Sequence, residues 1–240
     1  KRTLRGTCPS KFAVFFCPNF DRNSREALHE IFDELAAPRI PGDFTAEEFI
    51  AVYEVENERC WKAYREGTLT QQQLRPLRFK RSVEKLGIPS FQGMDELAES
   101  MGEAYVKRAP YRTALVDGAM EVCAALNERG HRMFILTNGF EEVQHIKMKN
   151  SGLSPYFLKV LTSDALGYKK PRREAFDASI AIAESNASSA IMIGDDLECD
   201  VAGAMDAGWR SIYFNPHGVD ADPKFQQIAH LRELLDLPLT

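Results

Sequence analysis

The sequence lacks the features that mark several large classes of protein. Its cysteines have no CxxC or Cys/His spacing, so neither a zinc site nor a disulfide framework is expected, and a reducing cytoplasm is the expected location. No apolar run approaches the roughly 18 residues that a membrane helix needs. The net charge of −5 argues against a nucleic-acid polymer or a membrane surface as partner, since both usually require a basic face. The five cysteines are Cys8, Cys17, Cys60, Cys123 and Cys199.

The chain does contain enough apolar material for a folded core. It has 240 residues, of which 44% are hydrophobic, and this allows one substantial core with or without a smaller domain beside it. From residue 21 to residue 110, apolar side chains keep helical spacing, as at Leu28, Ile31 and Leu35, and nothing alternates with period two. This stretch predicts an all-helical subdomain whose helices are punctuated by prolines, Pro76 among them.

After about residue 111 short apolar segments alternate with helical ones. The expected strands are "MFILTNG", "LKVLTS", "AIMIG" and "RSIYF", and the expected helices cover 117–130, 142–151, 172–185 and 200–208. This alternation is typical of βαβ units in a parallel sheet, which the apolar segment 11–16 would join. We therefore expect an α/β protein. Residues 11–20 and 111–240 would form a Rossmann-like parallel-sheet core, and 21–110 an inserted all-helical cap.

Polar residues directly after the expected strands are candidates for a site, because ligands of open α/β sheets bind outside the carboxyl ends of the strands. Thr137, Asn138 and Gly139 follow the segment "MFIL". A hydroxyl, an amide and a glycine that frees the backbone can together bind phosphate oxygens. An Asn-Gly pair is also common in ordinary turns, so this motif alone leaves both interpretations open.

A lysine pair, Lys169-Lys170, follows the next expected strand. Lys170 stands directly before Pro171, whose locked backbone stiffens the approach to the helix that follows. A lysine held there would place a positive charge near the strand ends. The alternative is an ordinary solvated surface lysine.

Three aspartates follow the strand "AIMIG". Asp195, Asp196 and Asp200 repel one another and raise one another's pKa unless they share a cation. Hard oxygen ligands at a rigid strand end suit Mg²⁺, which takes only one or two protein carboxylates and keeps several waters. A helix N-terminus also favours acidic residues, which explains one or two of the aspartates more easily than all three.

Taken together, these motifs resemble the second, third and fourth motifs of the haloacid dehalogenase-like hydrolase superfamily. The chain is similar to its nucleotidase-type phosphatases with a helical cap inserted after the first motif, over roughly residues 11–236. The segments that carry this resemblance are "ILTNGFEEVQHIKMKNSGLSPYF", "KKPRREAF", "IMIGDDLECDVAGAMDAGW" and "YFNPHG".

The resemblance implies transfer of a phosphoryl group from a small phosphorylated metabolite to water, with a nucleoside monophosphate as the expected substrate and Mg²⁺ as cofactor. It implies that Thr137 binds the transferring phosphoryl group and that Lys170 offsets negative charge. Asp195 would hold Mg²⁺, supported by Asp196 and Asp200. Such chemistry consists mostly of positioning and charge neutralisation, which these residue types supply.

The chain departs from the family pattern at the first motif, Asp-x-Asp-x-Thr. In the family its first aspartate attacks phosphorus to form an aspartyl phosphate, and its second is the general acid and base. Here the loop reads Cys17-Pro18-Asn19-Phe20-Asp21. Cys17 beside a cluster of aspartates would stay protonated, and Asn19 cannot exchange a proton as an acid or base.

Three interpretations follow from this departure. The chain is a phosphatase whose first-motif loop is altered or lost in this particular sequence, a pseudoenzyme that binds phosphorylated small molecules or a protein partner, or a scaffold that runs other chemistry with Cys17 as nucleophile. The sequence does not decide the substrate or the oligomeric state. Aromatic residues of the expected cap are more simply explained as core than as pocket wall.

Overall fold

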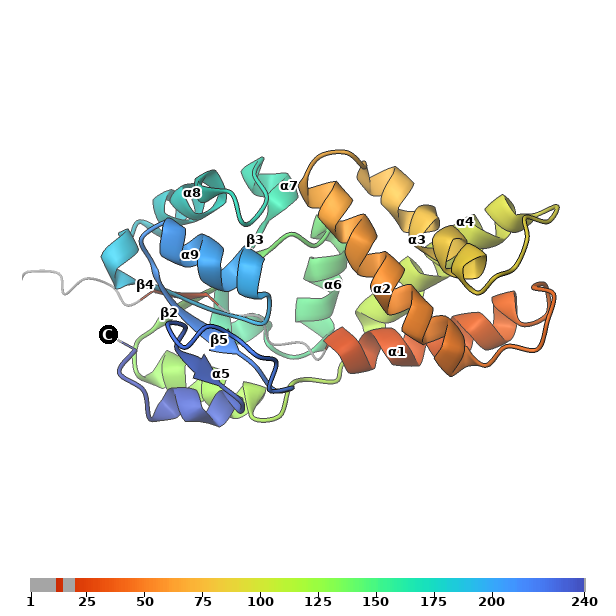
Figure 1. Ribbon diagram of the computed structural model, residues 1–240. Helices are drawn as coiled ribbons and strands as arrows, with labels where there is room; N and C mark the ends of the chain where they lie inside the picture. Colours follow the sequence, from red (N-terminus) through yellow and green to blue (C-terminus); the bar gives the residue numbers. More distant parts are fainter. Residues whose placement is uncertain (1–11, 15–19, 240) are drawn as a thin grey trace, which may run out of the picture. The chain divides into compact units, whose positions relative to one another are not determined.

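The computed structural model describes residues 12–14 and 20–239 (Figure 1). The chain divides into two compact units, one with strand β1 and the residues from Leu115 onward, the other ending at Ala114. The sequence predicts that the helical unit ends at residue 110, whereas it continues to Ala114. Cys17 and Asn19, the altered first-motif positions, lie outside the described residues.

The first unit is built on a six-stranded sheet in which all neighbouring strands are parallel. The strand order is β3-β2-β1-β4-β5-β6, so β2 and β4 lie on either side of β1. This confirms the predicted α/β class with a parallel-sheet core. The strands are β1 (Phe12–Val14), β2 (Arg132–Thr137), β3 (Phe157–Thr162), β4 (Ala190–Gly194), β5 (Arg210–Phe214) and β6 (Gln227–Ile228).

Both faces of this sheet are buried, as the continuous apolar runs of its strands require. Along β2, Met133 and Ile135 belong to one hydrophobic cluster, and Phe134 and Leu136 belong to another. Helices α5 (Ala119–Glu128) and η6 (Leu231–Leu235) pack against the first cluster. Helices α8 (Arg173–Ala183) and α9 (Gly203–Asp206) contribute to the second, on the opposite side of the sheet from α5 (Figure 1).

Three further helical elements of this unit follow strands at the candidate motifs. They are α6 (Glu141–Asn150), α7 (Ser163–Leu166) and the π-helical turn η5 (Leu197–Ala202). The helix expected over 200–208 therefore starts three residues earlier, and it starts in π geometry. The reason is local, because the carboxylate of Asp196 accepts the backbone N–H groups of Glu198 (3.0 Å) and Cys199 (2.8 Å) and so caps the turn.

The second unit is helical throughout its described part, as the sequence predicts. An aromatic cluster that includes Phe32, Phe49, Tyr53, Phe79 and Tyr105 forms much of its core. The described residues of the chain include no helix long and apolar enough to cross a membrane. The elements are α1 (Phe20–Ile31), η1 (Phe32–Ala36), α2 (Ala46–Arg65), α3 (Gln71–Lys85), α4 (Met94–Arg108) and η2 (Ala109–Tyr111).

Pro76 lies inside α3, not between two helices, so its expected role as punctuation is wrong. A capping box fixes the start of α3, since Thr70 and Gln73 exchange side-chain and backbone hydrogen bonds. Packing against α4 supports the same region. At Gly102 of α4 an added Cβ would lie 3.0 Å from the carbonyl oxygen of Arg75, the residue before Pro76. Tertiary contact thus overrides the helix-breaking preference of the proline.

A side-chain clamp joins the two ends of the helical unit. The amide of Asn23 donates to the carbonyl oxygen of Ala114 at 2.8 Å and accepts the N–H of the same residue at 3.1 Å. Asn23 is buried, so these bonds are shielded from water. The clamp fixes the chain where it leaves this unit.

Candidate active site

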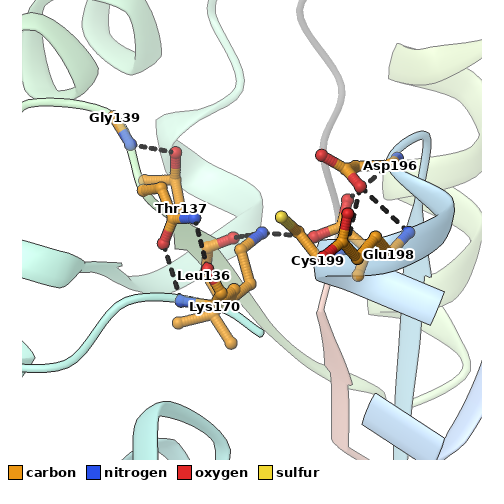
Figure 2. A network of polar contacts seen from close by, with 9 residues as sticks. Leu136, Thr137, Gly139, Lys170, Asp196, Glu198 and Cys199 are labelled. Carbon is orange, nitrogen blue, oxygen red and sulfur yellow. Dashed lines mark hydrogen bonds and ion pairs between the residues drawn. The ribbon is translucent and has the colours of Figure 1, made fainter. Parts of the chain in front are cut away.

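Lys170 is the centre of a polar network at the carboxyl end of β2 (Figure 2). Its ammonium group donates to the carbonyl oxygen of Leu136 at 2.8 Å and forms an ion pair with Asp200. The side chains of Lys170 and Asp200 are only 9% and 4% exposed. Lys170 is therefore not a solvated surface lysine, and its charge is fixed near the strand ends as predicted. Because the pair is shielded from water, it interacts more strongly than a surface pair would.

Asn138 holds the backbone of Lys170. Its amide nitrogen donates to the carbonyl oxygen of Lys170 at 2.9 Å, and its amide oxygen accepts the N–H of Lys170 at 2.8 Å. The structure shows that this amide positions the lysine with one of its two N–H groups and its oxygen, while phosphate binding by Asn138 stays a prediction. The sequence separation of 32 residues hides this relationship from any local pattern.

Thr137 ends β2 and is buried. Its hydroxyl oxygen accepts the backbone N–H of Gly139 at 2.9 Å, while its own proton has no acceptor among the described residues. A Cβ at Gly139 would come within 2.2 Å of the Gln144 amide nitrogen and 3.1 Å of the Thr137 hydroxyl. A side chain at position 139 would therefore displace the end of the Gln144 side chain, and the turn leaves one hydroxyl donor of Thr137 available.

Asp200 is held from both of its carboxylate oxygens. One oxygen contacts Lys170, and the other accepts the N–H of Asp196 at 3.3 Å. A Cβ at Gly194, the last residue of β4, would lie 2.2 Å from the second oxygen. The absence of a side chain at Gly194 thus lets Asp200 reach the strand end, a requirement that the sequence pattern did not reveal.

Asp195 has a different environment from its two neighbours. The residue keeps a solvent-exposed surface. The surrounding protein atoms and then the negative charge of Asp200 nevertheless raise the pKa of its carboxyl to about 6. The ammonium of Lys170 acts in the opposite direction. Burial by protein atoms and the negative charge of Asp200 both disfavour the carboxylate form of Asp195, and a bound cation would favour it.

The donor set fits Mg²⁺ only in part. Asp200 is committed to Lys170, and one oxygen of Asp196 is committed to the turn, which leaves Asp195 and the second oxygen of Asp196 as candidate ligands. One or two carboxylates with waters suffice for Mg²⁺. The described residues contain no group of three or more His, Cys, Asp or Glu side chains that could hold a metal. The three-aspartate ligand set stays a prediction, and Asp200 is better explained as support for Lys170.

Comparison with known proteins connects this geometry to one family. The model of the haloacid dehalogenase-like hydrolase family matches residues 17–208. Pyrimidine 5'-nucleotidase YjjG of Escherichia coli (strain K12) is 30% identical over 176 residues, which cover 72% of this chain and 73% of that protein. Ribulose-1,5-bisphosphate 5-phosphatase of Halopiger xanaduensis is 37% identical over 174 residues, or 72% and 71% of the two chains.

Solved structures agree with the sequence comparison. The YfnB protein of Bacillus subtilis, in a crystal structure bound to magnesium that reveals interdomain movement, superposes with a TM-score of 0.79 at 26% identity. The match covers 94% of this chain and 95% of that one. A dehalogenase at 18% identity superposes with a TM-score of 0.71, which supports the fold alone. Since the family model spans most of the sequence, the chain belongs to the haloacid dehalogenase-like hydrolase family.

Proposed function

We propose that this chain binds small phosphomonoesters, with nucleoside monophosphates as the expected class, and hydrolyses them far more slowly than a relative with an intact first motif. The observation that carries this proposal is the buried ammonium of Lys170, fixed between Leu136 and Asp200 at the end of β2. A phosphoryl group requires a fixed positive charge beside it. A purely structural ion pair could lie anywhere in the core, so its position at a strand end favours a binding role.

Binding depends on donors that the protein itself leaves unused. An ammonium has three N–H donors, and Lys170 directs two of them to Leu136 and Asp200. The third, together with the free hydroxyl proton of Thr137, can donate to phosphate oxygens, which only accept. Both donors come from rigid positions, so little ordering accompanies binding.

Mg²⁺ would be held by Asp195, with Asp196 beside it. When bound, it neutralises negative charge on phosphate oxygens. The fit rests on the solvent-accessible surface that the residue Asp195 keeps and on the raised pKa of its carboxyl, which a cation would lower. The remaining functions belong to side chains of the protein. Lys170 would orient the phosphoryl group, and the hydroxyl of Thr137 would donate a hydrogen bond to it.

Slow turnover follows from the sequence of the opening loop. With the strand segment before the loop kept in register, Cys17 and Asn19 stand where the family pattern has two aspartates. With the following helix kept in register, about five loop residues are missing instead, and in both alignments the attacking and proton-donating carboxylates are absent. Each missing function removes about 10²-fold or more in rate. The proposal therefore predicts a protein that binds phosphorylated metabolites much better than it hydrolyses them.

A cytoplasmic location stays a prediction.

The names of relatives support the substrate class. YjjG and PynA of Streptococcus pneumoniae are both pyrimidine 5'-nucleotidases, whereas the Halopiger protein is a sugar bisphosphate phosphatase. All three names describe phosphomonoesters of small molecules. A pyrimidine nucleoside monophosphate is accordingly the first ligand to test.

The experiment combines calorimetric binding of uridine monophosphate with phosphate release in the presence of Mg²⁺. We expect saturable binding that Thr137→Ala weakens by roughly tenfold, the value of one charge-assisted hydrogen bond. The control Thr113→Ala removes an exposed hydroxyl and leaves binding unchanged. Equal affinity for the wild type and Thr137→Ala would contradict the binding site. Turnover by the wild type in the ordinary enzyme range, about 1 s⁻¹ or faster, would contradict the impairment.

A further inference from the structure

The helical unit contains two arginines whose charges are not matched by nearby carboxylates. Arg78 and Arg81 are one helical turn apart on α3, which lies beside α2 (Figure 1). Arg78 is only 3% exposed, and its Nη1 donates to the side-chain oxygen of Asn57 on α2 at 3.1 Å. Its Nε is buried and has no hydrogen-bond partner. Arg81 is half-buried, and its Nη1 lies 3.7 Å from the sulfur of Cys60.

The other neighbours of Arg78 are aromatic rings. Its guanidinium carbon lies 4.5 Å from the ring centre of Tyr105, 5.3 Å from that of Phe79 and 5.7 Å from that of Tyr53. The faces of these rings attract a cation, and they also hold the guanidinium in place. They carry no net charge, however, and cannot accept the proton of Nε as a carboxylate would.

In the described ranges 12–14 and 20–239, no carboxylate forms an ion pair with either arginine. Glu56 is buried nearby on α2, but its ion pair is with Arg59. The thiol of Cys60 stays neutral near pH 7, because burial raises its pKa further than Arg81 lowers it. Within these ranges neither Arg78 nor Arg81 forms an ion pair with a carboxylate.

Such an arrangement is costly unless an anion completes it. A buried guanidinium without a counter-ion loses hydration that nothing replaces, and like charges one helical turn apart repel each other. We propose that Arg78 and Arg81, with Asn57 beside them, form an anion-binding site in the helical unit that takes a compact oxyanion, namely a phosphate or carboxylate group. The planar fork of arginine matches both groups and can donate two parallel hydrogen bonds to either.

This site goes beyond the proposed hydrolysis, because it shares no residue with the network around Lys170. Its own helix provides a matched control. Lys80 lies between the two arginines in sequence, but its ammonium is paired with Asp95 at 2.7 Å. Lys80→Gln therefore removes the same charge from the same helix without touching the cluster.

The test is a titration of the full ¹⁵N-labelled chain with inorganic phosphate and, separately, with acetate, followed by the Nε–Hε signals of its arginines. Sodium chloride at equal ionic strength is the reference. We expect the Arg78 signal to shift saturably with at least one oxyanion and to stay in place with chloride. Arg81→Gln should weaken this binding roughly tenfold, since it removes a charge-assisted hydrogen bond, while Lys80→Gln leaves it unchanged.

The outcomes separate this site from the one at the strand ends. Binding that shifts Arg78 in both the wild type and Thr137→Ala supports the site in the helical unit, whatever happens to the signals of residues 137–139. An Arg78 signal that stays unmoved by phosphate and acetate, or that moves equally with chloride, overturns the proposal. Arg81→Gln keeps the buried Arg78 intact, so the test does not depend on a variant that disturbs the core.

Discussion

The ammonium of Lys170 and the carboxylate of Asp200 form a buried ion pair that joins the loop before α8 to the turn after β4. Both partners have further hydrogen bonds, the lysine to Leu136 and the aspartate to the N–H of Asp196. When a buried ion pair has its other polar atoms hydrogen-bonded, removal of either partner leaves an uncompensated buried charge and strongly destabilises the protein. This contact brings the second, third and fourth motifs into one network.

Asp200→Asn tests the energetic importance of this pair. The substitution keeps the shape of the side chain but leaves the buried ammonium without a counter-charge, so we expect a loss of about 3–5 kcal/mol in the free energy of unfolding. Chemical denaturation measures it. Asp177→Asn breaks the exposed pair of Asp177 with Arg173 and should cost less than about 1 kcal/mol. Similar losses for the two variants would mean that Lys170 is hydrated and not held by Asp200.

Asn138→Ala tests the clamp on the backbone of Lys170. The substitution removes two hydrogen bonds and should cost about 1–3 kcal/mol. It should also speed hydrogen exchange at the amide of Lys170, which mass spectrometry or NMR can follow. Asn186→Ala, which removes the cap of a surface turn, should leave that amide protected. Unchanged exchange in Asn138→Ala would show that the loop is held by other contacts.

The carboxyl of Asp195 should make the stability of the metal-free protein depend on pH. The folded state raises its pKa from 3.8 to about 6, so between these values the folded chain keeps a proton that the unfolded chain releases. The contribution of Asp195 to stability therefore falls as pH rises through this window. The loss is on the order of 1 kcal/mol, because the exposed residue is partly screened by water.

Asp195→Asn removes this contribution to the pH dependence. With a chelator present, the variant should be more stable than the wild type at pH 7, and the difference should disappear below about pH 4. Thermal unfolding from pH 4 to pH 7 measures both effects. Asp206→Asn removes a charge from an exposed position on α9 and should follow the wild type. If the wild type instead gained stability relative to Asp195→Asn as pH rises, the pKa of Asp195 would be lowered in the folded state and not raised.

Magnesium should stabilise the folded chain through Asp195. At a Mg²⁺ concentration ten times its Kd, the free energy of unfolding should increase by about 1.4 kcal/mol. Asp195→Asn should abolish most of this gain, while Asp206→Asn should keep it. Differential scanning calorimetry with Mg²⁺ and with Ca²⁺ or chelator provides the comparison. Equal stabilisation of the wild type and Asp195→Asn would place the metal elsewhere.

The sequence predicted the parts of this fold that depend on regular patterns. Alternating apolar strands and helices predicted the parallel sheet, and the order of strand ends placed Thr137, Lys170 and Asp200 in one region. What it could not predict depends on contacts distant in sequence. The role of Asn138 is set by a partner 32 residues away. The space beside Gly194 is taken by a side chain from the next turn.

The helical unit shows the same limit. Pro76 inside α3 is tolerated because α4 packs against it through Gly102, and Arg78 is buried in spite of its charge by rings from α2, α3 and α4. Helical spacing identifies an apolar face, but an arginine in the sequence is normally expected to be exposed to solvent. Only the packing of three helices shows which charged residue becomes enclosed.

The central claim is that a phosphate-binding scaffold is present while the attacking and proton-transferring carboxylates are absent. Restoring them in the double variant Cys17→Asp/Asn19→Asp tests it most directly, by the rate of phosphate release from uridine monophosphate with Mg²⁺. We predict an increase of about 10²-fold or more over the wild type, with Cys17→Ser/Asn19→Ser as the control that stays slow. A wild type already as fast as the double variant would contradict the claim, because the hydrolysis would then need no carboxylate at either position.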